Sequence, residues 1–200
     1  KSKTVTGRMW VYLSGGKGPV YTVFEFTVDR KAEHTLKFLE NFKGYVHADA
    51  YGGYDELFRK DGVLECACWM HVRRKFFEAL DGPVEFRDKT LKLIRNLYRY
   101  ERVLKDAKAE KRLEIRKEKI APIVEEIFKT ARDILTDPKS PILPKSKIRQ
   151  AITYLLNQEE ALKTFLTDGH VKPDNGASER AIRPLTIGRK NWMFVGSKNG

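Results

Sequence analysis

Apolar residues in the first third of the chain alternate between the spacing of strands and that of helices. Residues 8–13 and 20–27 are rich in aromatic and β-branched side chains, and a segment of glycines and a proline separates them, which predicts a β-hairpin with a long turn. Apolar residues occupy both faces of each strand, so we expect the hairpin to lie inside a covered sheet. Residues 30–42 then have helical spacing, with Asp29 as the expected N-cap.

Two shorter apolar runs follow, each next to a helical pattern. Residues 45–48 and 64–69 predict strands, and residues 54–59 and 71–80 predict helices. A hairpin followed by strands that alternate with helices is typical of an α/β fold whose sheet has an antiparallel part and a parallel part.

The pattern changes near residue 87, because only helical spacing is found from there to residue 168. Apolar positions predict one long helix through Leu93 and Leu104 and another from Ile120 to Ile134. One or two more helices are expected after a proline-rich connection. We interpret this stretch as a helical insertion with charged outer faces.

The last part of the chain predicts a short helix that begins near Asn175 and ends before Pro184. Proline favours a helix end because it lacks the N–H group that would donate to the carbonyl of the preceding turn. Trp192–Val195 is expected to be a final strand or a packed tail. We therefore divide the chain into a first core part, a helical insertion and a C-terminal core part: residues 1–86, 87–168 and 169–200.

The charge of the chain indicates the class of its partners. A net charge of +12 and a sequence pI of about 9.6 give a surface field that attracts polyanions, with nucleic acid as the first candidate and an anionic membrane as the second. No segment has the length and apolar character of a membrane span or a signal peptide, which predicts a cytoplasmic protein without membrane contacts. The two closely spaced cysteines do not form a disulfide framework.

Two carboxylates stand at positions suited to a metal site. Asp49 comes directly after a predicted strand and shortly before a pair of glycines that allow a sharp turn. Glu179 stands near the start of the last predicted helix. Each also has a structural explanation, since Asp is common in turns and Glu at the third helical position completes a capping box. Together, in a basic protein, they predict a Mg²⁺ or Mn²⁺ site for phosphodiester chemistry.

Cysteine and histidine residues form a second pattern between these acids. Cys66, Cys68 and His71 are spaced Cys-x-Cys-x-x-His, with His47 as a potential fourth zinc donor. This is not the spacing of a known zinc finger, and buried cysteines beside a strand usually serve packing, so we do not expect zinc. His71 either points toward the crevice that Asp49 faces or makes a local hydrogen bond at a helix start.

Three basic clusters are candidate phosphate contacts. They are Arg73, Arg74 and Lys75; Arg180 and Arg183; and Arg189 and Lys190. A single cluster is more often a solvated face, but three that flank the predicted acidic site favour DNA binding. Trp192 is expected to pack in the tail, with stacking on a base as the alternative.

Five blocks of sequence, spread over nearly the whole chain, carry a resemblance to a known family. The blocks are Gly7–Tyr12, His47–Tyr54, Ala67–Phe77, Asp174–Pro184 and Gly188–Trp192. In this order they resemble bacterial transposases of the insertion-sequence-66 (IS66) family. One block would be weak evidence, whereas five blocks in the family's order are specific.

The resemblance implies a ribonuclease H-like mixed sheet flanked by helices and a DDE active site, which nicks DNA at transposon ends in a metal-dependent reaction and joins the strand to target DNA through attack by its 3′-hydroxyl. It makes Asp49 the second acid and Glu179 the third, with two metal ions, and it makes Cys68, His71 and Asn175 supporting residues. It also implies a homo-oligomer on DNA, in a bacterial cytoplasm and at the nucleoid during activity, and it leaves open whether accessory proteins of the same element take part.

The chain departs from the family pattern at two places. Gly176 stands where the family often has a second Asn, and the first acid belongs on a core strand that would precede Gly7. We therefore expect this chain alone to bind metal weakly and to perform no strand transfer. Two other functions stay open: a ribonuclease H-like nuclease, and a DNA-binding or assembly module whose acids are structural.

Overall fold

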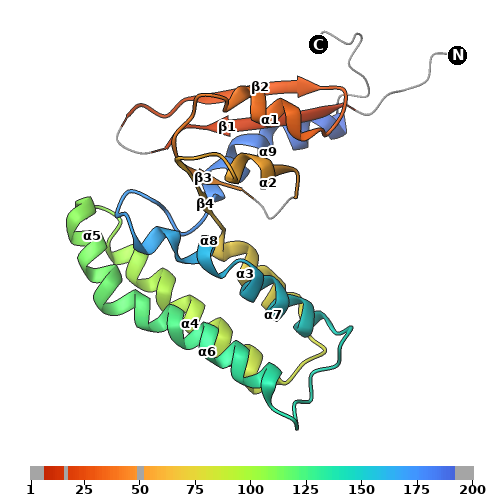
Figure 1. Cartoon of the computed structure of the whole chain (residues 1–200), viewed down its shortest axis with the longest axis vertical. Helices are drawn as coiled ribbons and strands as arrows, with labels where there is room; N and C mark the ends of the chain where they lie inside the picture. The colour runs from red at the N-terminus through yellow and green to blue at the C-terminus, as the bar shows by residue number, and fades with distance from the viewer. Residues whose placement is uncertain (1–6, 16–17, 49–51, 192–200) are drawn as a thin grey trace, which may run out of the picture. The chain divides into compact units, whose positions relative to one another are not determined.

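The computed structural model describes residues 7–15, 18–48 and 52–191, with only the backbone described for residues 189–191 (Figure 1). It is a mixed α/β structure with two small sheets. The chain divides into a first unit (residues 1–44, 51–63 and 175–200) and a second unit (residues 45–50 and 64–174). In the part of the chain that is described, no helix is long and apolar enough to cross a bilayer.

A β-hairpin forms the sheet of the first unit. Strand β1 (Arg8–Leu13) pairs antiparallel with strand β2 (Thr22–Thr27), with the first residue of β1 opposite the last residue of β2. The Trp10 indole N–H donates a hydrogen bond of 2.8 Å to the Thr27 hydroxyl across the pair. The predicted hairpin is thus confirmed, and its aromatic and β-branched residues fit the pleated surface that favours them.

The hairpin is accompanied by helical elements, namely α1 (Ala32–Phe38), η1 (Gly52–Tyr54), α2 (Asp55–Phe58) and α9 (Gly176–Asn191). The Tyr12 ring of β1 stacks on Phe38 of α1, with centroids 3.8 Å apart. Helix α1 begins later than predicted, since Lys31 is its N-cap. The Asp29 carboxylate instead accepts hydrogen bonds from the Lys31 N–H and the His34 ring, so Asp29 acts in the turn before the helix.

The hairpin is less covered than its sequence predicts. Its sheet holds only β1 and β2 among the described residues, and Met9, Val23, Phe24 and Phe26 are exposed. The expectation of a covered sheet is therefore wrong for the described hairpin. Apolar residues on both faces of a strand indicate that both faces favour burial, but they do not say which segment provides the cover.

Two strands form the second sheet, β3 (Gly44–His47) and β4 (Val63–Cys66). The Gly44 N–H donates to the Gly62 carbonyl (2.8 Å), and the Ala48 N–H donates to the Cys66 carbonyl (3.4 Å). The offset in sequence is the same at both ends (62 − 44 and 66 − 48), so the two strands run parallel. The parallel part of the predicted α/β fold is thus present.

Helices make up the remainder of the second unit, namely α3 (Trp69–Glu78), α4 (Val84–Val103), α5 (Ala109–Ile115), the π-helical segment η2 (Arg116–Ile120), α6 (Ala121–Thr136), α7 (Lys147–Asn157), α8 (Glu159–Lys163) and η3 (Thr164–Leu166). The long helices predicted from apolar spacing are confirmed as α4, α6 and α7. Helix α5 and segment η2 were not predicted, and they run directly into α6. Segment η2 lies just before Pro122, which cannot donate to the carbonyl of Glu118 four residues back.

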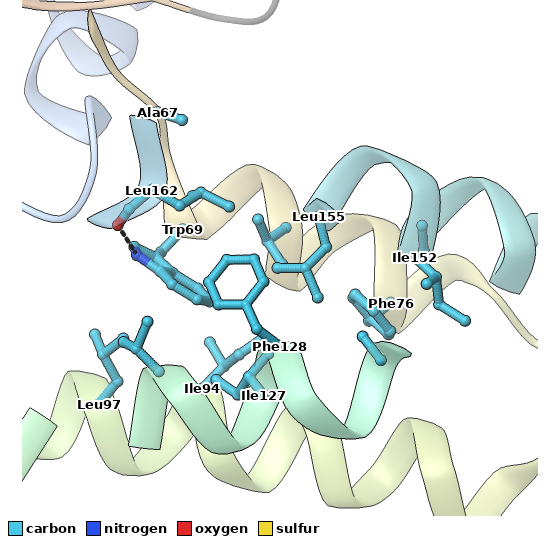
Figure 2. Packing of buried hydrophobic residues seen from close by; sticks show 14 of the residues in the cluster. Ala67, Trp69, Phe76, Ile94, Leu97, Ile127, Phe128, Ile152, Leu155 and Leu162 are labelled. Atoms are coloured by element: carbon cyan, nitrogen blue, oxygen red, sulfur yellow. Dashed lines mark hydrogen bonds between the residues drawn. The ribbon is translucent and has the colours of Figure 1, made fainter. Parts of the chain in front are cut away.

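The core of the second unit is built from apolar side chains of these helices (Figure 2). Trp69 is fully buried, and its indole N–H donates to the Leu162 carbonyl (3.0 Å). The ring of Phe128 meets the Trp69 ring edge-on, with centroids 6.1 Å apart. Phe76 and Leu155 are also fully buried. Since each such side chain contributes about 1.5–3 kcal/mol on burial, this cluster is the main source of stability in the second unit.

The last helix is longer than predicted. Helix α9 passes through Pro184 and ends at Asn191, whereas the sequence suggested an end before Pro184. A proline removes one backbone hydrogen bond, but the helical turns on either side retain theirs, and α9 packs along β1 within the first unit. Trp192–Val195, predicted as a strand or a packed tail, lies outside the described residues.

Candidate functional site

The first candidate metal ligand, Asp49, lies outside the described residues, but the strand that leads to it is described. Strand β3 ends at His47, and buried Ala48 continues the pairing by donating to the Cys66 carbonyl. Parallel strands have their carboxyl ends at the same edge of a sheet, which is where binding crevices of α/β proteins form. Ala48 therefore marks the carboxyl edge of the β3–β4 pair, and Asp49 is the next residue in the sequence.

Cys68 and His71 lie at the start of helix α3. Cys68 is the N-cap, and its carbonyl accepts hydrogen bonds from the N–H groups of His71 (3.1 Å) and Val72 (3.3 Å). The Cys68 side chain is buried, and the His71 side chain is half-buried. The Cys-x-x-His spacing thus joins the N-cap of a helix to its third residue, and these two positions belong to the same turn.

The cysteines and histidines near β4 do not gather into a metal-binding group within the described part of the chain. No position there brings the ligand atoms of Cys66, Cys68, His47 and His71 close enough together. Burial, together with a smaller effect of the neighbouring Glu65 carboxylate, raises the pKa of the Cys66 thiol to about 12. A thiol that stays protonated at neutral pH is a poor zinc ligand, because zinc binds the thiolate.

One group of potential ligands does occur elsewhere in the first unit. The ligand atoms of Asp29, Glu33 and His34 all lie within 4.8 Å of one another. The His34 ring contacts Asp29 at 2.7 Å, and the Lys31 ammonium lies 3.6 Å from both carboxylates. The side chains already include a cation, so the group is explained as an ion-pair cluster at the start of α1.

A buried polar group in the second unit was missed by sequence reasoning. Burial raises the pKa of the Tyr98 hydroxyl, and the Asp174 carboxylate raises it further. Burial lowers the pKa of His47, and Asp174 opposes this shift, which leaves the ring neutral at pH 7. The Asp174 carboxylate therefore interacts electrostatically both with His47 at the end of β3 and with Tyr98 in the middle of α4. Tyr98 gave no signal in the sequence, because it is one of several aromatic residues in an amphipathic helix.

A buried arginine fixes the segment that leads to Asp174. The Arg116 guanidinium is 1% exposed and donates hydrogen bonds of 2.8–3.0 Å to carbonyls within residues 165–171. It also pairs with both oxygens of the Glu101 carboxylate, at 2.7 and 2.8 Å. The backbone N–H of Trp69 donates to the Pro173 carbonyl (3.0 Å), so the same segment is tied to the start of α3.

The second candidate ligand, Glu179, lies in the first turn of α9, and its side chain is exposed. The Asn175 carbonyl accepts hydrogen bonds from the N–H groups of Ser178 (2.9 Å) and Glu179 (3.3 Å), which closes this turn. Arg183 follows four residues later, on the same face of the helix. An exposed carboxylate here is accessible to a hydrated cation, although the helix dipole alone would also favour it.

The basic cluster on α3 is exposed and partly held by aromatic rings. Arg73, Arg74 and Lys75 are all exposed. The Lys75 ammonium lies 4.6 Å from the centre of the Tyr154 ring of α7, and the Arg73 guanidinium lies 5.9 Å from the Phe77 ring. These cation–π contacts orient the side chains and leave their charge at the surface.

The predicted site residues are divided between the two units. The second unit holds Cys68, His71 and the cluster of Arg73, Arg74 and Lys75. The first unit holds Asn175, Glu179, Arg180 and Arg183, and the last three of these are exposed. Arg189 and Lys190 belong to α9, but their side chains lie outside the described residues. The predicted site residues thus come from both units.

Comparison with known proteins gives a consistent assignment. The whole chain, residues 1–200, matches the family described as Transposase IS66 family. The chain is 31% identical to the uncharacterized protein y4hP and 34% identical to the uncharacterized protein y4qI, both of Sinorhizobium fredii (strain NBRC 101917 / NGR234). The matches cover 100% and 99% of this chain but only 40% and 38% of these relatives. No solved structure matches the chain significantly.

Proposed function

Because the chain belongs to the IS66 family of transposases, we propose that it is part of a catalytic region that cuts DNA at the ends of an insertion sequence and joins them to target DNA. The chain spans about 40% of the length of the curated relatives, so the activity is proposed for the longer protein to which such a chain belongs. The observation that carries the proposal is the match over all 200 residues, together with an exposed acid, Glu179, at the start of the last helix.

The fold proposed for this region is ribonuclease H-like. An antiparallel hairpin, a parallel strand pair and a final helix that carries an acid occur in the order that such a fold requires. The division into a core of residues 1–86 and 169–200 with a helical insertion at 87–168 is part of the same proposal. The uninterrupted series of helices from α4 to η3 supports it.

Asp49 and Glu179 are the proposed metal ligands and catalytic residues. Glu179 fits a hard cation such as Mg²⁺ or Mn²⁺, since its carboxylate oxygens are the preferred donors and are exposed to solvent. Two bound ions would activate the attacking oxygen and stabilise the leaving oxygen of a phosphodiester. Cys68, His71 and Asn175 support the site by forming the turns at the starts of α3 and α9.

The exposed basic residues are the proposed DNA contacts. Arginine and lysine bind phosphate oxygens through charge-assisted hydrogen bonds, so these residues would hold the DNA backbone near the acids. They comprise Arg73, Arg74, Lys75, Arg180 and Arg183, together with Arg189 and Lys190. We also expect a homo-oligomer on paired ends, accessory proteins of the same element, and a bacterial cytoplasmic location.

The test is a nicking assay on duplex DNA that carries the ends of the element. It uses the chain and a longer form extended before Lys1, with Mg²⁺ or Mn²⁺, and compares wild type with Asp49→Ala and Glu179→Ala. A metal ligand supplies several kcal/mol of transition-state stabilisation, so each variant should lose on the order of 10³-fold in nicking rate.

Glu110→Ala is the matched control, because Glu110 is also an exposed carboxylate near the start of a helix. Its nicking rate should stay near that of wild type. Unchanged nicking in a folded Asp49→Ala or Glu179→Ala variant would show that an acid has been misplaced. DNA binding without any nicking by the longer form would favour a binding or assembly module.

A further inference from the structure

Helix α4 carries a row of cations along its outer face. Lys92, Arg95, Arg99 and Arg102 are spaced by three, four and three residues, which places them on one side of a helix. All four are exposed, whereas the helix buries its opposite side in the core of the second unit. We call these four residues the α4 stripe.

The stripe differs from the other cations of the helical unit, many of which are paired. Lys129 lies 2.7 Å from Asp133, and Lys111 lies 2.7 Å from Glu114. Within the described residues, none of the four stripe side chains pairs with a carboxylate, and Arg99 lies against the Tyr100 ring, 5.7 Å from its centre.

The carboxylates that α4 itself carries near the stripe are bound to other arginines. Asp88, one turn before Lys92, accepts hydrogen bonds of 3.1 Å from Arg87. Glu101, next to Arg102 in the sequence, is bound to the buried Arg116. The charge of the stripe is therefore not neutralised by its own helix.

An unneutralised row of this kind is unfavourable for the isolated helix. Like charges three or four residues apart each destabilise a helix by about 0.2–0.5 kcal/mol. From Lys92 to Arg102 the helix rises ten residues (102 − 92), or about 15 Å. One strand of duplex DNA presents a phosphate about every 3.4 Å along its axis, so the stripe can follow several consecutive phosphates.

We propose that the α4 stripe binds the sugar–phosphate backbone of duplex DNA, which makes the helical insertion a DNA-binding part of the protein. The inference rests on the proposed function for the identity of the polyanion. Contacts to phosphates position a protein on the duplex but carry no sequence information, so the stripe would add affinity without sequence preference.

The test is the salt dependence of duplex DNA binding by the chain, followed by fluorescence anisotropy. The stripe variant has Lys92, Arg95, Arg99 and Arg102 all changed to Gln. The control variant has Lys89, Lys111, Lys119 and Lys129 changed to Gln, which are exposed lysines paired with carboxylates. Both variants lower the net charge from +12 to +8 (12 − 4), so a difference in DNA binding between them reflects which cations are removed and not the total charge.

The slope of log K against log salt concentration is negative, and the stripe variant should reduce its magnitude by up to about 3.6, at about 0.9 for each phosphate that is no longer neutralised. The control should lower it by less than about 1. Circular dichroism and melting midpoints should match wild type for both variants, since surface substitutions usually change stability by less than about 0.5 kcal/mol.

Equal slopes for the two variants would overturn the stripe proposal, as would the absence of DNA binding by wild type. Salt-dependent binding to anionic lipid vesicles through the stripe, without DNA binding, would assign the stripe to a membrane surface. Loss of DNA binding in the stripe variant but not in the control would support the stripe proposal even if the nicking assay failed. The two proposals can therefore fail separately.

Discussion

At the scale of single residues, Arg116 shows how one buried charge can organise a loop. Its guanidinium joins α4 to the segment before the last helix through an ion pair and hydrogen bonds to three carbonyls. Burying a charge is costly unless each donor finds a partner, and Arg116 has partners for its charge and its hydrogens. Its role is to fix the position of residues 165–171, the segment that leads to Asp174.

Replacing Arg116 by Met should therefore destabilise the chain by about 3–5 kcal/mol, since it leaves Glu101 and several carbonyls without their donor. Urea denaturation followed by circular dichroism measures this as a lower midpoint. Lys117→Met is the control, because the neighbouring Lys117 is exposed and should change stability by no more than about 0.5 kcal/mol. Equal midpoints for the two variants would contradict the role assigned to Arg116.

The Cys66 thiol gives a prediction that depends on pH. Burial raises its pKa to about 12 from the ordinary value of 9.0, so the native protein keeps the proton where an unfolded chain loses it. Its contribution to stability is complete below pH 9 and is lost as the pH rises from 9 to 12.

In a Cys68→Ser variant, labelling of Cys66 by a thiol reagent at pH 8 should be on the order of 10³-fold slower in the native protein than in denaturant. The same variant in denaturant serves as the control for reagent activity. A native rate within tenfold of the denatured rate would show that the thiol is accessible and ionised.

At the scale of elements, regular apolar spacing was sufficient to predict the hairpin, both parallel strands and the long helices α4, α6 and α7. It failed where a boundary depends on local chemistry. Pro184 favours a helix end because proline removes one backbone hydrogen bond, yet α9 continues through it because the helical turns on both sides persist. Helix α5 and segment η2 were missed because their charged sequence has little apolar spacing.

The candidate site was predicted less completely than the fold. The sequence pointed to His71 and Glu179 near helix starts, and the structure describes both in such positions, whereas Cys68, expected at the end of a strand, is the N-cap of α3 because β4 ends at Cys66. It could not reveal that Asp174 acts on both His47 and Tyr98, because these residues come from three separate elements or segments of the second unit. Contacts between distant segments leave no local pattern, whereas caps and turns do.

At the scale of the whole molecule, apolar burial is unevenly distributed. Nearly all the described buried apolar side chains belong to the second unit, whereas the hairpin of the first unit leaves Phe24 and Phe26 exposed. Local stability follows buried apolar contacts, so the two units should open with different free energies.

Hydrogen exchange followed by mass spectrometry should therefore show faster exchange in β1 and β2 than in α4 and α6. A difference of about 3 kcal/mol in opening free energy corresponds to roughly a hundredfold or more in protection. Equal protection in both sets of amides would indicate that the chain opens as one cooperative body.

The π-helical segment η2 sets the angle by which α5 is rotated relative to α6 about their common helix axis. Each residue in an α-helix advances the chain by about 100°, so removing one residue from η2 would leave a continuous helix but rotate α5 by that angle about the common axis. Arg112 would then lose the carbonyls of Leu104 and Gly169, to which it now donates. The additional residue of η2 therefore acts as an angular spacer. It sets which face of the helix points inward before and after Pro122, and this effect does not depend on the length of the helix.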